Sequence, residues 1–185
     1  MGTPTLIVVS GPPGSGKTTL AHVIARAIPC PAICRDEIKE GLVHAEGPAY
    51  EPEPGDQVTY RTFETFFAIL RLLLSAGATV VAEAAFQHQV WAPNLEPMLD
   101  IAKASIIHCV VDPSVARARI ASRAAADPRA RAGHPDALLL SALDSGELSL
   151  ADFDPIALAA PSMRVDTTDG YVPALDEILA FIEQD

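Results

Sequence analysis

The feature that most constrains this chain is the segment Gly11–Thr18, which has the sequence GPPGSGKT. It matches the phosphate-binding pattern G-x-x-x-x-G-K-[ST] at every fixed position. Glycines let such a loop curl so that its amides point at phosphate oxygens, and the following helix adds its positive amino-terminal end. Lys17 is expected to reach the β- and γ-phosphates of a nucleotide, and the Thr18 hydroxyl to ligate Mg²⁺. We therefore expect ATP and Mg²⁺ as cofactors. The residues expected to contact ATP here are Gly11, Gly14, Ser15, Gly16, Lys17, Thr18 and Thr19.

Strand-like and helix-like patterns alternate along the chain on both sides of this motif. Short apolar runs predict strands at 6–9, 32–34, 79–82, 105–111 and 163–166. Helical spacing and capping residues predict helices starting near Lys17, Asp36 (as N-cap) and Asp112, and over 59–74, 91–103, 135–143 and 172–182. This alternation predicts an α/β fold with a parallel sheet covered by helices on both faces. We expect residues 1–185 to form a single domain.

The charge and composition of the chain limit the molecules that it is expected to bind. A net charge of −11 argues against nucleic acid, whose phosphate backbone is usually bound by many Lys and Arg residues. Five of the 13 basic residues are nevertheless concentrated between positions 117 and 131, which suggests a local anion site. No signal peptide or membrane-spanning run is visible. The three cysteines form no CxxC pair, so we expect a reduced, cytoplasmic protein, and the Cys30–Cys34 spacing alone does not favour zinc.

The motifs together resemble those of the small P-loop kinases, a family that includes adenylate kinase, gluconate kinase, chloramphenicol phosphotransferase and polynucleotide kinase. The resemblance rests on the loop at 11–18, the RDEIK segment at 35–39, the strand ending in Glu83 and the segment VARARIASR at 115–123. It implies a P-loop NTPase three-layer sandwich whose five-stranded parallel sheet has the order 2-3-1-4-5. It also implies a small arginine-bearing lid at about residues 117–136.

The resemblance also assigns roles to polar residues beside the expected phosphate site. Asp36 would act as the catalytic base that accepts the proton of the attacking hydroxyl, although Asp also serves well as a helix N-cap. Glu83 would hold Mg²⁺ together with Thr18. Lys39 and Arg61, with Asp36, would bind the acceptor, whereas an ordinary solvated position remains equally open for Lys39.

Arginines of the expected lid complete the candidate nucleotide site. By the resemblance, Arg119 would stack on the adenine ring, and Arg123 would contact phosphate and support catalysis. Thr167, after the last strand, would lie near the base, although an ordinary turn is an equal alternative. Other candidates for neutralising transition-state charge are Arg117, Arg129 and Arg131.

These residues favour an ATP-dependent phosphotransferase that moves the γ-phosphoryl group to a hydroxyl of a small molecule. A polynucleotide 5′-hydroxyl kinase is one alternative, favoured by Arg35-Asp36 but not by the net charge. A second is an ATP-binding switch or accessory protein without an acceptor, which the acids at positions 36 and 83 make less attractive. Acidic residues within 44–56 would suit an acceptor that carries amines.

Overall fold

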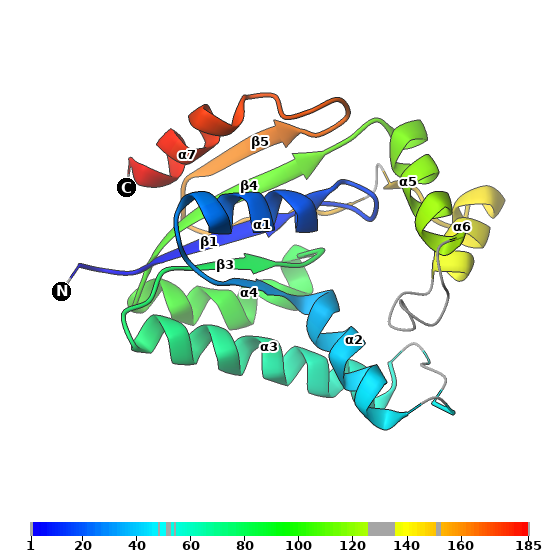
Figure 1. The fold of residues 1–185 in the computed structure, drawn as a ribbon, viewed down its shortest axis with the longest axis horizontal. Coiled ribbons are helices and arrows are strands. Elements are labelled where there is room, and N and C mark those ends of the chain that lie inside the picture. The colour runs from blue at the N-terminus through cyan, green and yellow to red at the C-terminus, as the bar shows by residue number, and fades with distance from the viewer. Residues whose placement is uncertain are drawn as a thin grey trace.

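The computed structural model describes residues 2–47, 49–50, 53, 55–125, 136–150 and 153–184, which form layers of helices on both sides of a parallel sheet (Figure 1). The strands run in the order β2-β3-β1-β4-β5. This order confirms the predicted α/β fold and its 2-3-1-4-5 sheet. The strands are β1 (Thr5–Ser10), β2 (Ala32–Cys34), β3 (Val80–Glu83), β4 (Lys103–Val110) and β5 (Ser162–Asp166).

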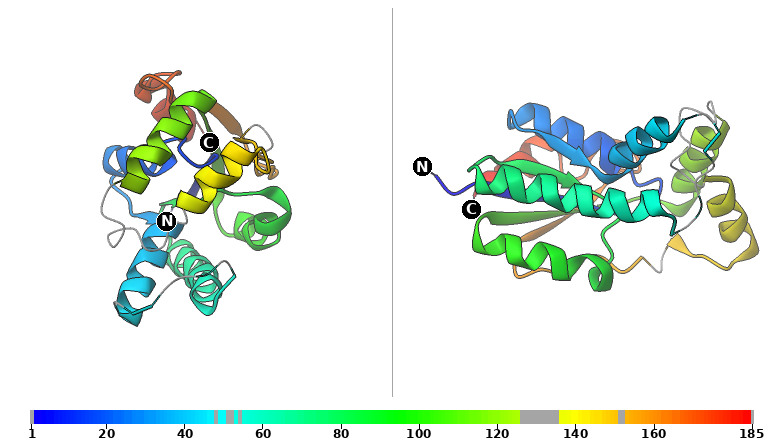
Figure 2. Two further views of the ribbon diagram at one scale, coloured as in Figure 1. Left: turned by 90° about the vertical axis from the view of Figure 1, so that its right-hand side faces the viewer. Right: turned by 90° about the horizontal axis from the view of Figure 1, so that it is seen from below.

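Helices cover both faces of this sheet. The helical segments are α1 (Lys17–Ala27), α2 (Arg35–Glu46), α3 (Gln57–Ser75), α4 (His88–Leu95), the 3₁₀ helix η1 (Glu96–Asp100), α5 (Pro113–Ala125), α6 (Asp136–Ser145) and α7 (Leu175–Glu183). Helices α1 and α7 lie over one face, whereas α3 and α4 lie over the other. Helices α5 and α6 stand at the end of the molecule opposite the two termini (Figure 2). Among the described residues, no helix combines the length and the apolar character needed to cross a membrane.

The central strand β1 shows why the apolar run after the amino terminus forms a strand. Leu6 and Val8 pack in the cluster that contains α3 residues, whereas Ile7 and Val9 pack in the cluster that contains α1 residues. All four side chains are fully buried because helices cover both faces of the sheet. A continuous apolar run, rather than an alternating one, is the pattern expected of such a strand.

The register of the sheet brings the ends of three strands together. Val9 in β1 lies opposite Glu83 in β3, and Glu83 in turn lies opposite Cys34 in β2. The loop at 11–18, Glu83 and the start of α2 therefore share the carboxyl edge of the sheet. This edge is where parallel α/β sheets bind ligands.

Two predicted helix boundaries are wrong. The helix predicted over 91–103 is divided into α4 and η1, because Pro97 has no amide hydrogen to continue the α-helical pattern. The last helix begins at Leu175 rather than at 172, because the backbone of Val172 instead exchanges hydrogen bonds of 2.8 and 2.9 Å with Asp166. The second error lies at the carboxyl edge of the sheet, because Asp166 is the last residue of β5.

Candidate active site

The loop at 11–18 is closely packed against its surroundings at two of its glycines. A Cβ atom at Gly11 would lie 2.6 Å from the carbonyl oxygen of Cys109 and 2.6 Å from Ser15 Oγ. Gly14 has φ +77°, and a Cβ atom there would lie 2.6 Å from the carbonyl oxygen of Ala116 in α5. Glycine is therefore required at position 14 both for the left-handed backbone and for the approach of α5.

The backbone of the loop differs from the expectation at one amide. The Ser15 amide donates to the Pro12 carbonyl oxygen at 3.2 Å, so in this structure it closes a turn and does not remain free for phosphate. Ser15 is one of the residues predicted to contact ATP, but its backbone amide is not available for that contact in this conformation. Gly16 then precedes the first residue of α1 and accepts a hydrogen bond from the Leu20 amide at 3.1 Å. The positive end of α1 consequently points into the loop, as an anion site requires.

Lys17 and Glu83 meet at the carboxyl edge of the sheet. Lys17 Nζ lies 3.8 Å from Glu83 Oε1, and the two side chains are 9% and 1% exposed. Burial raises the pKa of the Glu83 carboxyl, whereas the positive charge of Lys17 opposes that rise. Neither carboxylate oxygen of Glu83 has a hydrogen-bond partner among the described residues. A buried carboxylate with unsatisfied oxygens suits a hard cation that prefers oxygen ligands, such as Mg²⁺.

Thr18 and Thr19 differ in their surroundings. Thr18 is half-buried on the first turn of α1, next to Lys17. That it ligates Mg²⁺ together with Glu83 stays a prediction. Thr19 is exposed on the same turn. Its predicted contact with ATP stays a prediction.

Asp36 lies in the first turn of α2, immediately after β2. The N-cap of this helix is Cys34, so the prediction that Asp36 serves as the N-cap is wrong. Its carboxylate Oδ1 instead accepts a hydrogen bond from Arg35 Nη1 at 2.7 Å. Its negative charge raises the pKa values of both Glu83 and Arg123. A charged carboxylate in the first turn is also favoured by the helix dipole.

Lys39 and Arg61, the cations predicted to bind the acceptor, have different surroundings. Lys39 is only 8% exposed, and burial followed by repulsion from Arg35 lowers the pKa of its amine. Arg61 is half-exposed on α3, and its Nη1 lies 2.5 Å from Glu46 Oε1 at the end of α2. Because Arg61 already pairs with Glu46, only Lys39 combines burial with a position one turn from Asp36 on α2.

The acidic segment at 44–56 is largely committed to internal contacts. Asp56 is the N-cap of α3, where it accepts a hydrogen bond from the Thr59 amide at 2.7 Å and another from the Tyr50 hydroxyl. These contacts hold the pKa of the Asp56 carboxyl well below its ordinary value, although its limited burial acts in the opposite direction. Glu46 pairs with Arg61, and position 51 lies outside the described residues. Two acids of this segment are therefore engaged in internal contacts, and an amine-bearing acceptor stays a prediction.

Arg119 and Thr167 bind the loop to the end of β5. Arg119 Nη2 donates to the Thr167 carbonyl oxygen at 2.7 Å, and its Nη1 donates to the Gly14 carbonyl oxygen at 3.3 Å. The Thr167 hydroxyl is buried and donates to the Ser15 carbonyl oxygen at 2.6 Å. Arg119 thus lies beside the loop, as its predicted contact with the nucleotide requires. Thr167 is placed to hold the loop through its hydroxyl group.

Arg123 forms two hydrogen bonds with the buried carboxylate of Asp136, which was not among the predicted site residues. Its Nε lies 2.7 Å from Asp136 Oδ2 and its Nη2 lies 2.5 Å from Asp136 Oδ1. Arg117 makes a comparable but exposed pair with Asp144, at 2.7 Å. Both pairs join α5 to α6. Arg129 and Arg131, also predicted to act in the lid, lie outside the described residues. The same holds for residues 126–135 of the predicted lid.

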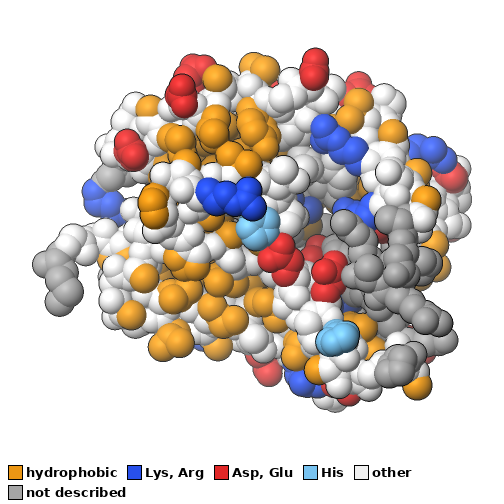
Figure 3. Space-filling model, viewed as in Figure 1, with side chains coloured by type: hydrophobic (Ala, Val, Ile, Leu, Met, Phe, Trp, Pro, Cys, Tyr) orange, Lys and Arg blue, Asp and Glu red, His pale blue; other side chains and the backbone are white. Residues whose placement is uncertain are grey.

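Charged side chains gather over this part of the surface. In the space-filling view, basic, acidic and histidine side chains lie next to one another over the middle of the face (Figure 3).

Comparisons with known proteins agree with this geometry. The family model of the AAA domain matches residues 6–145, whereas no curated protein matches the chain in sequence. A solved candidate kinase from Chloroflexus aurantiacus J-10-fl is 25% identical, with a TM-score of 0.83, and the similarity covers 99% of this chain and 98% of that one.

Two other solved structures share the fold at lower identity. A gluconokinase from Sinorhizobium meliloti 1021 is 21% identical with a TM-score of 0.57, over 98% of this chain and 93% of that chain. An APS kinase from Mycobacterium tuberculosis, solved with AMPPNP and APS, is 14% identical with a TM-score of 0.59, over the whole of both chains. The chain therefore belongs to the AAA domain family, and its resemblance to the small P-loop kinases is confirmed.

Proposed function

We propose that the protein transfers the γ-phosphoryl group of ATP to a hydroxyl group of a small molecule. The observation that carries this proposal is the buried contact between Lys17 and Glu83, which lie 3.8 Å apart at the edge of the phosphate loop. A lysine and an unsatisfied carboxylate beside one loop provide for a phosphate chain and for its metal ion. The kinases among the solved structures with this fold support the same class of reaction.

The loop and α1 bind the phosphates in this proposal. The amides of Gly14, Gly16 and Thr18 and the ammonium group of Lys17 surround the negative charge of the β- and γ-phosphates. Thr18 and Glu83 hold Mg²⁺, which when bound neutralises part of the charge on the triphosphate. Because Glu83 is almost wholly buried, its charged form is favoured once a cation lies next to it.

Asp36 acts on the acceptor. The acceptor oxygen attacks the γ-phosphorus while the bond from that phosphorus to the bridging oxygen breaks and ADP leaves. The hydroxyl proton passes to the Asp36 carboxylate, which Arg35 orients through the 2.7 Å hydrogen bond. Lys39, one turn further along α2, is placed to bind an anionic group of the acceptor.

The arginines of α5 form the opposite side of the site. They belong to the lid, which extends over about residues 117–136. Arg119 contacts the nucleotide base and keeps its bonds to Gly14 and Thr167. Arg123 lies close enough to Asp36 for their charges to interact. Exchange of its partner Asp136 for the γ-phosphate would bring a guanidinium group to the developing charge.

A coupled measurement of ADP release with ATP, Mg²⁺ and a library of hydroxyl compounds tests this function. At least one compound should stimulate ADP release by roughly a hundredfold over water, and Asp36→Asn should remove most of that stimulation. Glu64→Gln, at an exposed position of α3, is the matched control and should retain it. Wild-type transfer by Asp36→Asn would show that Asp36 is not the base.

The same assay separates the alternatives. Stimulation by a short 5′-hydroxyl oligonucleotide, and by no small molecule, would establish a polynucleotide kinase instead. Slow ADP release that no acceptor stimulates would establish an ATP-dependent switch.

A further inference from the structure

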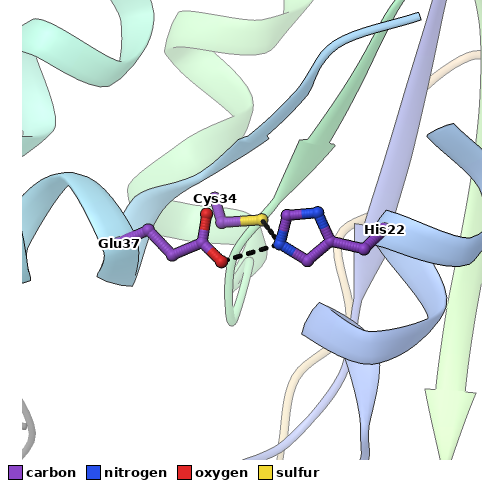
Figure 4. Close-up of side chains that lie close together, drawn as sticks. All are labelled: His22, Cys34 and Glu37. Carbon is purple, nitrogen blue, oxygen red and sulfur yellow. Dashed lines mark hydrogen bonds and ion pairs between the residues drawn. The ribbon is translucent and has the colours of Figure 1, made fainter. Parts of the chain in front are cut away.

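Three side chains of different chemistry converge beside the candidate active site. His22 comes from α1, Cys34 from the end of β2 and Glu37 from the first turn of α2 (Figure 4). His22 Nε2 lies 2.7 Å from Glu37 Oε1 and 3.7 Å from Cys34 Sγ. One nitrogen, one sulfur and one carboxylate oxygen all lie within 4.8 Å of one another.

These separations suit a small tetrahedral cation. A zinc ion at about 2.0 Å from nitrogen and oxygen and about 2.3 Å from sulfur places its ligand atoms about 3.3–3.6 Å apart. The sulfur and nitrogen already have nearly this separation. The nitrogen and oxygen would move apart by less than about 1 Å, which the exposed side chain of Glu37 permits.

The mixture of ligands also selects among cations. A thiolate and an imidazole favour zinc and similar borderline metals, whereas Mg²⁺ and Ca²⁺ prefer oxygen alone. Cys34 is 2% exposed, while the side chains of His22 and Glu37 are 37% and 48% exposed. The sulfur therefore lies at the base of the cluster, and the two other ligands leave a side open to solvent and to a water as fourth ligand.

We propose that His22, Cys34 and Glu37 bind a zinc-class divalent cation at a site that adjoins the proposed Mg²⁺ site at Thr18 and Glu83 but has different ligands, since Cys34 lies opposite Glu83 in the neighbouring strand. Binding replaces the thiol proton of Cys34, which passes to solvent, by a sulfur–metal bond. The bound ion joins the helix that follows the phosphate loop to the helix that carries Asp36. It therefore stabilises the folded protein by mass action.

Metal titration of the metal-free full chain tests this site, with saturating Mg²⁺ present to occupy the other. A chromophoric chelator reports the Kd for Zn²⁺, and Co²⁺ reports the ligands through its sulfur-to-cobalt charge-transfer band. Wild type should bind one Zn²⁺. Loss of one direct ligand should raise the Kd by at least roughly tenfold, since even outer partners have effects of this size. The test variants are His22→Gln, Cys34→Ser and Glu37→Gln.

Matched controls use residues of the same types outside the cluster. Cys30→Ser and His44→Gln should bind Zn²⁺ as wild type does, and Cys30→Ser should keep the Co²⁺ charge-transfer band that Cys34→Ser loses. Because His22 and Glu37 are partly exposed, their variants should fold even if Cys34→Ser does not. The proposal is overturned if wild type does not bind Zn²⁺ under these conditions. It is also overturned if His22→Gln and Glu37→Gln bind Zn²⁺ with the wild-type Kd.

Discussion

Replacing Gly14 by alanine should destabilise the protein more than the same change at another glycine of similar backbone conformation. Gly14 has φ +77° and Gly77, after α3, has φ +81°. A left-handed conformation costs alanine about 1–2 kcal/mol at either position. Only at Gly14 does the new Cβ also meet backbone, because it would lie 2.6 Å from the Ala116 carbonyl oxygen, whereas nothing lies within 4 Å of it at Gly77.

The difference between the two variants isolates the contact with α5. Overpacking of this kind costs about 1–3 kcal/mol, because α5 must move away from the loop. Gly14→Ala should therefore lower the free energy of unfolding by about 2–5 kcal/mol, and Gly77→Ala by about 1–2 kcal/mol. Urea denaturation of the nucleotide-free variants measures both values. Equal losses in the two variants would refute the close packing of the loop against α5.

Two further predictions concern charged residues of the site. Burial raises the pKa of Glu83, so without ligand the folded state keeps its proton at pH values where the unfolded chain has lost it. The stability of wild type relative to Glu83→Gln should therefore fall as the pH rises above 4.5, the ordinary pKa of Glu. Thermal denaturation between about pH 4 and 8 measures this trend. If the relative stability of wild type rose with pH instead, the charge of Lys17 would outweigh the effect of burial. Arg119→Ala should raise the Kd for ATP by roughly tenfold, because it removes stacking on the base and loosens the loop. Arg117→Ala should leave this Kd unchanged, because Arg117 forms an exposed ion pair with Asp144. Calorimetric titration with ATP and Mg²⁺ compares them, and equal Kd values would remove Arg119 from the site.

Much of the fold could be predicted because the apolar runs are short and helices cover the sheet on both sides. The run at 6–9 forms the central strand β1, and the acid that ends β3 lies where parallel strands present ligands. The order of the strands came from the resemblance to P-loop kinases, since hydrophobic periodicity carries no information on which strands are neighbours.

The predictions of helix starts were wrong where tertiary contacts, and not local sequence, determine the backbone conformation. Val172 is apolar and lies close before a helix, yet its backbone pairs with Asp166. Asp36 is a good N-cap residue by type, but the N-cap of α2 is Cys34, two residues earlier. Asp136, the buried partner of Arg123, gives only a weak signal in the sequence, namely an acid that follows the arginine-rich segment.

The cluster at His22 was missed for a related reason. The Cys30–Cys34 spacing does not favour zinc, because no second cysteine pair or histidine stands close to it in the sequence, but the fold brings His22 from the preceding helix to the Cys34 sulfur. Ligands that come from three different elements leave no local pattern in the sequence.

The most direct test of the central claim is the affinity of the Lys17→Ala variant for ATP with Mg²⁺, measured by calorimetric titration beside wild type. Lys17 contacts the buried Glu83 and lies on the first turn of α1. Loss of its ammonium group should weaken ATP binding by at least roughly tenfold, since charge-assisted contacts to phosphate are worth about 1.5–3 kcal/mol. Arg26→Ala, near the far end of the same helix, should bind as wild type does. An unchanged Kd for ATP in Lys17→Ala would contradict the claim that this loop is the nucleotide site.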